Sequence, residues 1–126
     1  MTTYLDTNVA VWLAQGQLDR ISKPATKYVQ DSSLLISPMV LIELEYLYEI
    51  RRLLIPARDI YLKLKSEIAV HVCELPFPEV ADRALNEKWT RDPFDRIIVA
   101  QAKAGGLSYL LSADSDIQEH YPRAVW

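Results

Sequence analysis

The sequence of 126 residues predicts an α/β protein built around a mainly parallel β-sheet. Short apolar runs alternate with segments of helical periodicity along the chain, which is typical of parallel strands connected and covered by helices. The length suits a single domain, residues 1–126, and half of the residues are apolar, as in ordinary globular proteins. No repeat, linker or low-complexity segment interrupts this pattern.

The predicted strands are short apolar runs bounded by polar residues or by turn-forming residues. The third of them is ended by Pro76 and Pro78, because proline cannot donate a hydrogen bond within a sheet. The strands are expected at residues 3–6, 32–37, 69–75, 107–112 and 124–126.

Prolines and glycines mark the ends of the predicted helices, since proline is tolerated in a first helical turn and glycine commonly stops a helix. The helix that follows Pro56 is amphipathic and carries four aliphatic residues between positions 60 and 68. Helices are expected at residues 38–53, from Pro56 to about 68, at residues 78–87, and from Pro93 to the glycine pair 105–106.

Composition excludes several classes of protein. The net charge of −3 argues against a protein that coats nucleic acid. Cys73 is the one cysteine and the two histidines are far apart, so any metal is expected to be held by oxygen ligands. No apolar stretch approaches the ~20 residues that span a bilayer, and no signal-type segment is present, so we expect a cytoplasmic protein without a membrane anchor.

Four acidic residues lie beside or inside apolar runs, where an unpaired charge is costly. They are Asp6, Glu43, Asp95 and Asp114. Asp6 and Asp114 follow two predicted strands, and ligands of open α/β sheets bind beyond the carboxyl ends of the strands. Carboxylates that share a cleft repel one another, and a divalent cation such as Mg²⁺ or Mn²⁺ relieves the repulsion.

Each acid also has a structural interpretation. Asp6, Thr7 and Asn8 are residues that form turns and helix caps, although the position of Asp6 at a strand end favours a ligand-binding role. Glu43 is more unusual, because helical periodicity places it on the apolar face of its helix. Glu45 and Glu49 fall on the solvated face of the same helix. For Glu43 a buried pair with an arginine is the alternative to metal binding.

The segment from Asp92 to Asp95 resembles a helix capping box, with Asp92 as N-cap and Pro93 as the first helical residue. Asp95, one turn into the helix, is expected to point at the crevice and is the favoured metal ligand, with Asp92 as a lesser candidate.

Asp114 has a rival in Asp116, since residues 114–116 could form a simple loop. Asp114 is closer to the end of its strand and is therefore preferred. Ser112 is a lesser candidate that could supply a hydroxyl group to a ligand or to an acid.

Aromatic and basic residues are given mainly structural roles. The larger aromatic side chains are expected to fill the core rather than to stack on bases. They are Trp12, Trp89, Tyr46, Tyr48 and Phe94. Arg91 and Arg96 flank the acidic pair of the fourth helix, and we expect that they could contact phosphate.

Four motifs together resemble the PIN domain, and within it the VapC toxins of toxin–antitoxin pairs. They are Tyr-Leu-Asp-Thr-Asn at residues 4–8, Ser-Pro-Met-Val-Leu-Ile-Glu-Leu at 37–44, Asp-Pro-Phe-Asp-Arg-Ile-Ile-Val-Ala-Gln-Ala at 92–102, and Leu-Leu-Ser-Ala-Asp at 110–114. The resemblance covers essentially the whole chain in the same order.

The resemblance implies a three-layer α/β/α fold and an endoribonuclease site that depends on Mg²⁺ or Mn²⁺. Carried over by position, the catalytic and metal-binding acids are Asp6, Glu43, Asp95 and Asp114, with Asp92 and Asn8 as plausible helpers. It also implies a homodimer, an RNA substrate and a VapB-like antitoxin whose C-terminal segment enters the active-site groove.

Two other functions are considered. A haloacid-dehalogenase-like phosphatase needs a second aspartate two residues after the first, where this chain has Asn8. An amide cannot exchange the proton that a general acid must supply. A PIN-like module that binds RNA or protein without catalysis is the second alternative, and the intact set of acids disfavours it.

Overall fold

A parallel sheet of five strands forms the centre of the computed structural model, which describes residues 1–126. The strands are β1 (Thr2–Leu5), β2 (Ser33–Ile36), β3 (His71–Val72), β4 (Tyr109–Leu111) and β5 (Ala124–Val125). Their order is β3-β2-β1-β4-β5, and each neighbouring pair is parallel. The predicted parallel sheet is therefore confirmed, and the carboxyl ends of all the strands lie at one edge.

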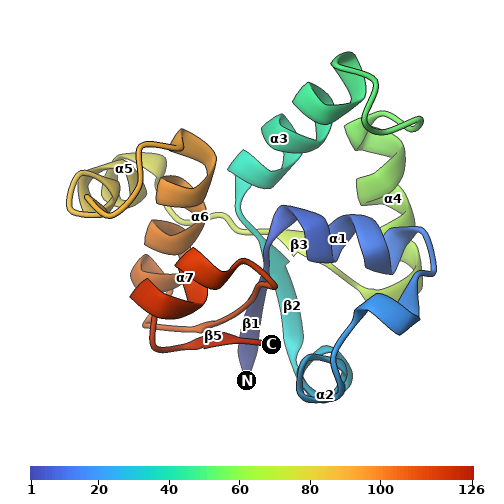
Figure 1. Cartoon of the computed structure of the whole chain (residues 1–126), viewed down its shortest axis with the longest axis horizontal. Helices are drawn as coiled ribbons and strands as arrows, with labels where there is room; N and C mark the ends of the chain where they lie inside the picture. The colour runs from blue at the N-terminus through green and yellow to red at the C-terminus, as the bar shows by residue number, and fades with distance from the viewer.

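Helices cover both faces of the sheet. They are α1 (Thr7–Ala14), α2 (Lys23–Asp31), α3 (Pro38–Glu49), α4 (Ala57–Ile68), α5 (Phe77–Ala84), α6 (Pro93–Ala104) and α7 (Ser115–His120), with a short 3₁₀ helix, η1 (Leu18–Arg20). In Figure 1, α5, α6 and α7 lie to the left of the sheet, while α1, α2 and α4 lie to its right. This is the expected three-layer arrangement, and α3 packs against both α4 and α6. No helix has the length and apolar character that crossing a bilayer requires.

The helix that begins at Pro38 ends at Glu49, earlier than the predicted end near Leu53. Arg51 adopts a left-handed backbone conformation with φ of 65°. The amide of Arg52 then donates to the carbonyl of Leu47 at 2.8 Å, and the amide of Arg51 donates to that of Tyr48 at 3.0 Å. These bonds form a Schellman motif, which stops the helix without glycine.

Other predicted elements are also longer than those observed, among them the fourth strand, which was expected over residues 107–112 and contains only Tyr109–Leu111. The third strand was expected over residues 69–75 but contains only His71 and Val72, because Ala69 is the left-handed C-cap of α4 with φ of 56°. Helix α5 begins at Phe77 and ends at Ala84 rather than at Glu87. At the sheet edge, β3 pairs with one neighbour only, so the turn geometry around it determines its length.

The expectation that the large aromatic residues fill the core is wrong for two of them. The side chains of Tyr46 and Tyr48 are 49% and 39% exposed. Trp12, Trp89 and Phe94 are half-buried and pack against the core with one side. The helical spacing of Tyr46 therefore turns it outward, where its ring lies 5.9 Å from that of Phe94.

A buried polar network joins three elements that carry the predicted site acids. Gln101 of α6 accepts a hydrogen bond from the Ser37 hydroxyl at 3.1 Å, and its amide donates to Cys73 Sγ at 3.3 Å. The Tyr4 hydroxyl lies 3.1 Å from the same sulfur. Ser37 is the N-cap of α3, and Tyr4 lies in β1 two residues before Asp6. The network therefore ties β1, α3 and α6 to one another beneath the carboxyl edge.

Replacing Gln101 by leucine should lower the free energy of unfolding by about 1–3 kcal/mol, because Ser37 and Cys73 would each lose a buried hydrogen-bond partner. Chemical denaturation monitored by circular dichroism measures this change. Gln30→Leu is the control, because Gln30 is an exposed helical residue on α2. Equal stability of the two variants would show that the network does not stabilise the fold.

Candidate active site

Asp6 lies at the carboxyl end of β1 and is the N-cap of α1. Its Oδ1 accepts a hydrogen bond from the amide of Thr7 at 2.8 Å, and its Oδ2 accepts one from the Ser112 hydroxyl at 2.7 Å. Burial raises the pKa of the Asp6 carboxyl, and these two hydrogen bonds oppose the rise because they favour the ionised form. Asp6 is thus a buried acid whose orientation is determined by two donors.

Glu43 faces Asp6 from the middle of α3. The Thr7 hydroxyl donates to Glu43 Oε1 in a very short hydrogen bond, so Thr7 links the two acids through its amide and its side chain. Burial raises the pKa of the Glu43 carboxyl, and the charges of Asp6 and Asp92 also raise it. No arginine pairs with Glu43, so the alternative of a buried ion pair is wrong.

Asp92 and Asp95 begin α6. Asp92 is the N-cap, and its Oδ1 accepts from the amides of Phe94 at 2.8 Å and Asp95 at 3.4 Å. Burial, the largest cause, and the charges of Asp92, Asp6, Asp114 and Glu43 together raise the pKa of the Asp95 carboxyl to about 7. Asp95 therefore experiences the negative charge of all the other acids of the cluster.

Asp114 follows β4 and is the N-cap of α7, where its Oδ1 accepts from the amides of Asp116 at 2.8 Å and Ile117 at 3.2 Å. The Ser112 hydroxyl accepts from the amide of Asp114 at 3.1 Å while donating to Asp6. Leu5 and Leu111 are register partners, which brings the residues that follow them together across two neighbouring strands. The structure therefore brings Asp6 and Asp114 to one edge, as the strand ends indicated.

We call these five residues the acidic cluster: Asp6, Glu43, Asp92, Asp95 and Asp114. No basic side chain forms an ion pair with the cluster, because the one ion pair of the chain joins Lys103 Nζ to Glu87 Oε1 at 2.5 Å. No three acidic, histidine or cysteine side chains already surround a common point as the ligands of a preformed metal site would. The donor set still fits a hard divalent cation, which prefers carboxylate oxygens and would offset the repulsion.

Several other sequence candidates lie outside this hydrogen-bonded cluster. Asn8 is exposed and lines a separate hollow, and Asp116 is exposed in the first turn of α7. The Arg96 guanidinium donates to the carbonyls of Ala84 and Leu85 at 3.2 and 3.3 Å, so it caps α5. Because its guanidinium is used in this cap, Arg96 is not free for the expected phosphate contact. Arg91 is exposed.

Sequence reasoning missed Thr7 and treated Ser112 as a minor candidate. Both side chains are buried, and their hydroxyl groups orient Glu43 and Asp6. The available signal was a hydroxyl residue shortly after each of two strands, Thr7 after β1 and Ser112 after β4. Only the pairing of β1 with β4 shows that Ser112 lies next to Asp6.

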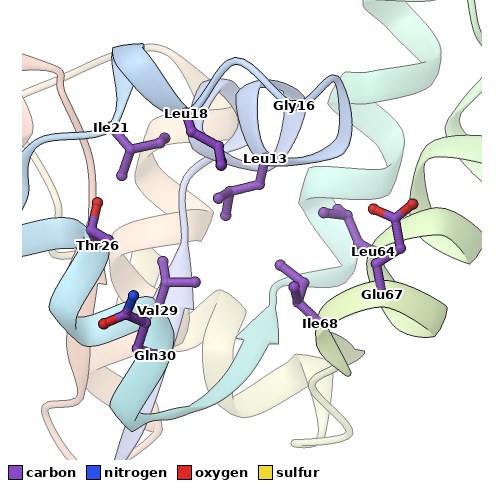
Figure 2. Close-up of a pocket in the computed structure, with 10 residues that line it drawn as sticks. All are labelled: Leu13, Gly16, Leu18, Ile21, Thr26, Val29, Gln30, Leu64, Glu67 and Ile68. Carbon is purple, nitrogen blue, oxygen red and sulfur yellow. The ribbon is translucent and has the colours of Figure 1, made fainter.

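An apolar hollow of about 350 Å³ lies apart from the acidic cluster, between α1, α2 and α4. Figure 2 shows Leu13, Val29 and Ile68 pointing into it from these three helices. Glu67 is the one acidic residue in its lining. This hollow suits an apolar ligand or side chain and not a metal ion.

Three solved structures share the architecture of the chain. VapBC2 from Rickettsia felis bound to a promoter DNA fragment has 17% sequence identity and a TM-score of 0.65, over 99% of this chain and 96% of that chain. A toxin–antitoxin complex from Klebsiella pneumoniae has 17% identity and a TM-score of 0.62, over 98% and 96%. VapC20 from Mycobacterium tuberculosis, described as a sarcin-ricin loop cleaving toxin, has 18% identity and a TM-score of 0.57, over 94% of each chain.

At these identities the structural likeness shows a shared fold. Comparison with curated protein sequences gave no match. The family model of the PIN domain matches residues 3–122, nearly the whole chain, and the match includes every member of the acidic cluster. The chain therefore belongs to the PIN domain family.

Proposed function

We propose that this chain is an endoribonuclease that depends on Mg²⁺ or Mn²⁺ and acts as the toxin of a VapBC-type pair. One observation carries the proposal: acids from four separate segments meet at the carboxyl edge of the sheet, and no basic side chain forms an ion pair with them. Burial and the charges of neighbouring acids raise the pKa of Asp6, Glu43 and Asp95, so added positive charge would stabilise their ionised forms. A single domain, residues 1–126, would carry this activity.

Asp6 and Asp95 are the proposed direct metal ligands, and Glu43 and Asp114 would bind the ion or orient water. A bound cation would supply the charge that polarises the scissile phosphate and acidifies the attacking water. Asp95 has a pKa of about 7, so near neutral pH it would exchange a proton for the cation.

Thr7 and Ser112 have supporting roles in this proposal. Their hydroxyl groups donate to Glu43 and Asp6, which restricts how these carboxylates rotate. Carboxylates that cannot rotate freely lose less entropy when the site assembles around an ion and a phosphate. Asn8 does not occupy the place of a general acid beside the cluster, since it is exposed and lines another hollow.

A VapB-like antitoxin is the proposed protein partner. The shared fold with VapBC2 and with a toxin–antitoxin complex supports it, and the apolar hollow between α1, α2 and α4 would accept an apolar segment of such a partner. The cytoplasm is the proposed compartment, since Cys73 is buried and unpaired.

We also propose a homodimer. Ile42, Tyr46 and Ile50 form a row at four-residue spacing along α3 and its C-cap, and their side chains are 59%, 49% and 44% exposed. A helix face with this much exposed apolar surface is typical of an interaction site. Sedimentation of a monomer at working concentration would contradict the dimer.

Replacing Asp6 by asparagine should reduce RNA cleavage by roughly 100-fold or more, because it removes a charge aimed at the proposed ion while asparagine still caps α1. Total cellular RNA incubated with purified protein and Mg²⁺ or Mn²⁺ provides the assay, and EDTA should abolish cleavage by the wild type. Asp82→Asn, an exposed acid on α5, is the control and should cleave normally. Full activity of Asp6→Asn, or cleavage in EDTA, would contradict the proposal.

The metal-free protein should be more stable at pH 5 than at pH 8. The pKa of Asp95 in the folded state is about 7, above its unfolded value, so the folded state binds the proton more tightly and loses stability as pH rises through 7. The melting temperature should fall by a few degrees, since 1 kcal/mol shifts it by roughly 4 °C in a domain of this size.

Asp95→Asn should show a smaller fall over the same range, and Mg²⁺ at pH 8 should raise the melting temperature of the wild type more than that of the variant. Differential scanning calorimetry of both proteins measures these shifts. Identical pH and Mg²⁺ responses would mean that Asp95 is not under the electrostatic stress described above.

A further inference from the structure

Two hollows adjoin along α1 and α3 and lead away from the acidic cluster. The first, of about 440 Å³, is lined by Glu43 and Asp92 at the acidic end and by Leu47 and Arg52. Tyr46 and Ile50 of the proposed dimer face also line it, so that face borders the hollow. The second, of about 320 Å³, is lined by Leu47 and Arg52 together with Asn8, Trp12 and Arg20. Because Leu47 and Arg52 line both of them, the two hollows adjoin at these residues, and we call them together the α1–α3 groove.

The far half of the α1–α3 groove has positive charge and no carboxylate. Arg20 and Arg52 are its charged residues, and Asn8, Gln15 and Gln17 add amide groups. Neither arginine is paired, since the one ion pair of the chain is elsewhere and Arg96 is the arginine whose guanidinium makes hydrogen bonds. Two free guanidinium groups in a concave surface are suited to bind anions.

The fold positions the guanidinium of Arg20 and the backbone of Arg52. The guanidinium carbon of Arg20 lies 5.6 Å from the centroid of the Trp12 ring, which in turn packs against Trp126 at 5.7 Å. The Schellman motif at the end of α3 fixes the backbone of Arg52, because its amide donates to the carbonyl of Leu47 at 2.8 Å.

We propose that the α1–α3 groove binds the single-stranded RNA that flanks the scissile phosphate, with Arg52 and Arg20 each contacting a backbone phosphate. The amide side chains would face the Watson–Crick edges of bases, which are free only in unpaired RNA. This inference rests on the proposed nuclease function, because the groove begins at Glu43 and Asp92 of the acidic cluster.

An acidic segment of a partner protein is the rival occupant. RNA is favoured because a substrate must extend from the acidic cluster, and the α1–α3 groove leads from the cluster to arginines without an ion-pair partner. An acidic peptide that lay along the same path would meet Glu43 and Asp92, which repel it.

The test measures binding of a fluorescein-labelled, mixed-sequence RNA of about ten nucleotides to the Asp6→Asn protein, in which cleavage does not interfere. Arg20→Gln and Arg52→Gln are added singly, and Arg58→Gln is the control. Arg58 is an exposed arginine on α4 that lines a different hollow, so the charge change is matched. Wild-type protein in EDTA serves if Asp6→Asn does not fold.

Each groove variant should weaken RNA binding by about fivefold to tenfold and reduce the slope of log affinity against log salt by about 0.7, as expected when one phosphate contact is lost from single-stranded RNA. Arg58→Gln should change affinity by less than about twofold. In otherwise wild-type protein, Arg52→Gln should raise KM more than it lowers kcat.

Other outcomes would overturn the assignment. If RNA binds and is cleaved but the groove variants behave like Arg58→Gln, the groove is not the RNA path and the nuclease function stands. If Arg20→Gln and Arg52→Gln lose binding of a labelled hexaglutamate peptide but keep RNA affinity, the groove receives an acidic protein segment. If the protein neither binds nor cleaves RNA, the groove assignment and the nuclease function both fail.

Discussion

Repulsion among five carboxylates at one sheet edge is the constraint on which the rest of this structure depends. Burial and, after it, the charges of the other four acids raise the pKa of Asp95 to about 7, so this carboxyl resists ionisation in the absence of a cation. Such a cluster opposes folding, so the framework that holds it must be stable for other reasons. The parallel sheet and the apolar core supply that stability, and the buried network around Gln101 joins β1, α3 and α6 directly beneath the acids.

The fold also compensates part of the repulsion with neutral dipoles. Asp6, Asp92 and Asp114 are the N-caps of α1, α6 and α7, so three helix N-termini point their positive ends toward the cluster. Backbone amides and the hydroxyls of Thr7 and Ser112 donate to the carboxylates. These contacts orient the acids but supply no full positive charge. A divalent cation would supply the positive charge that offsets the remaining repulsion.

Much of this arrangement could be predicted from the sequence. The parallel sheet could be predicted from the strands that precede Asp6 and Asp114 and from the first-turn prolines Pro38 and Pro93. The same signals predicted which acids lie near one another. These signals are local, and the rule that parallel strands present their carboxyl ends at one edge extends them to three dimensions.

Other features depend on contacts between distant residues and were not predicted. The link from Thr7 to Glu43 requires the packing of α1 against α3, and the end of α3 at Glu49 requires a non-glycine residue in a left-handed conformation. Arg96 looked available for phosphate until α5 supplied the carbonyls that it caps. The α1–α3 groove likewise forms only when the turn after α3 meets α1.

The most direct test of this account is a ¹³C NMR titration of the Asp95 side-chain carboxyl, first in metal-free protein and then with saturating Mg²⁺. The account predicts a pKa near 7 without metal, well above the ordinary value for aspartate, and a large fall when Mg²⁺ binds. A pKa near 4 that Mg²⁺ does not change would contradict both the electrostatic stress in the acidic cluster and its role as a cation site.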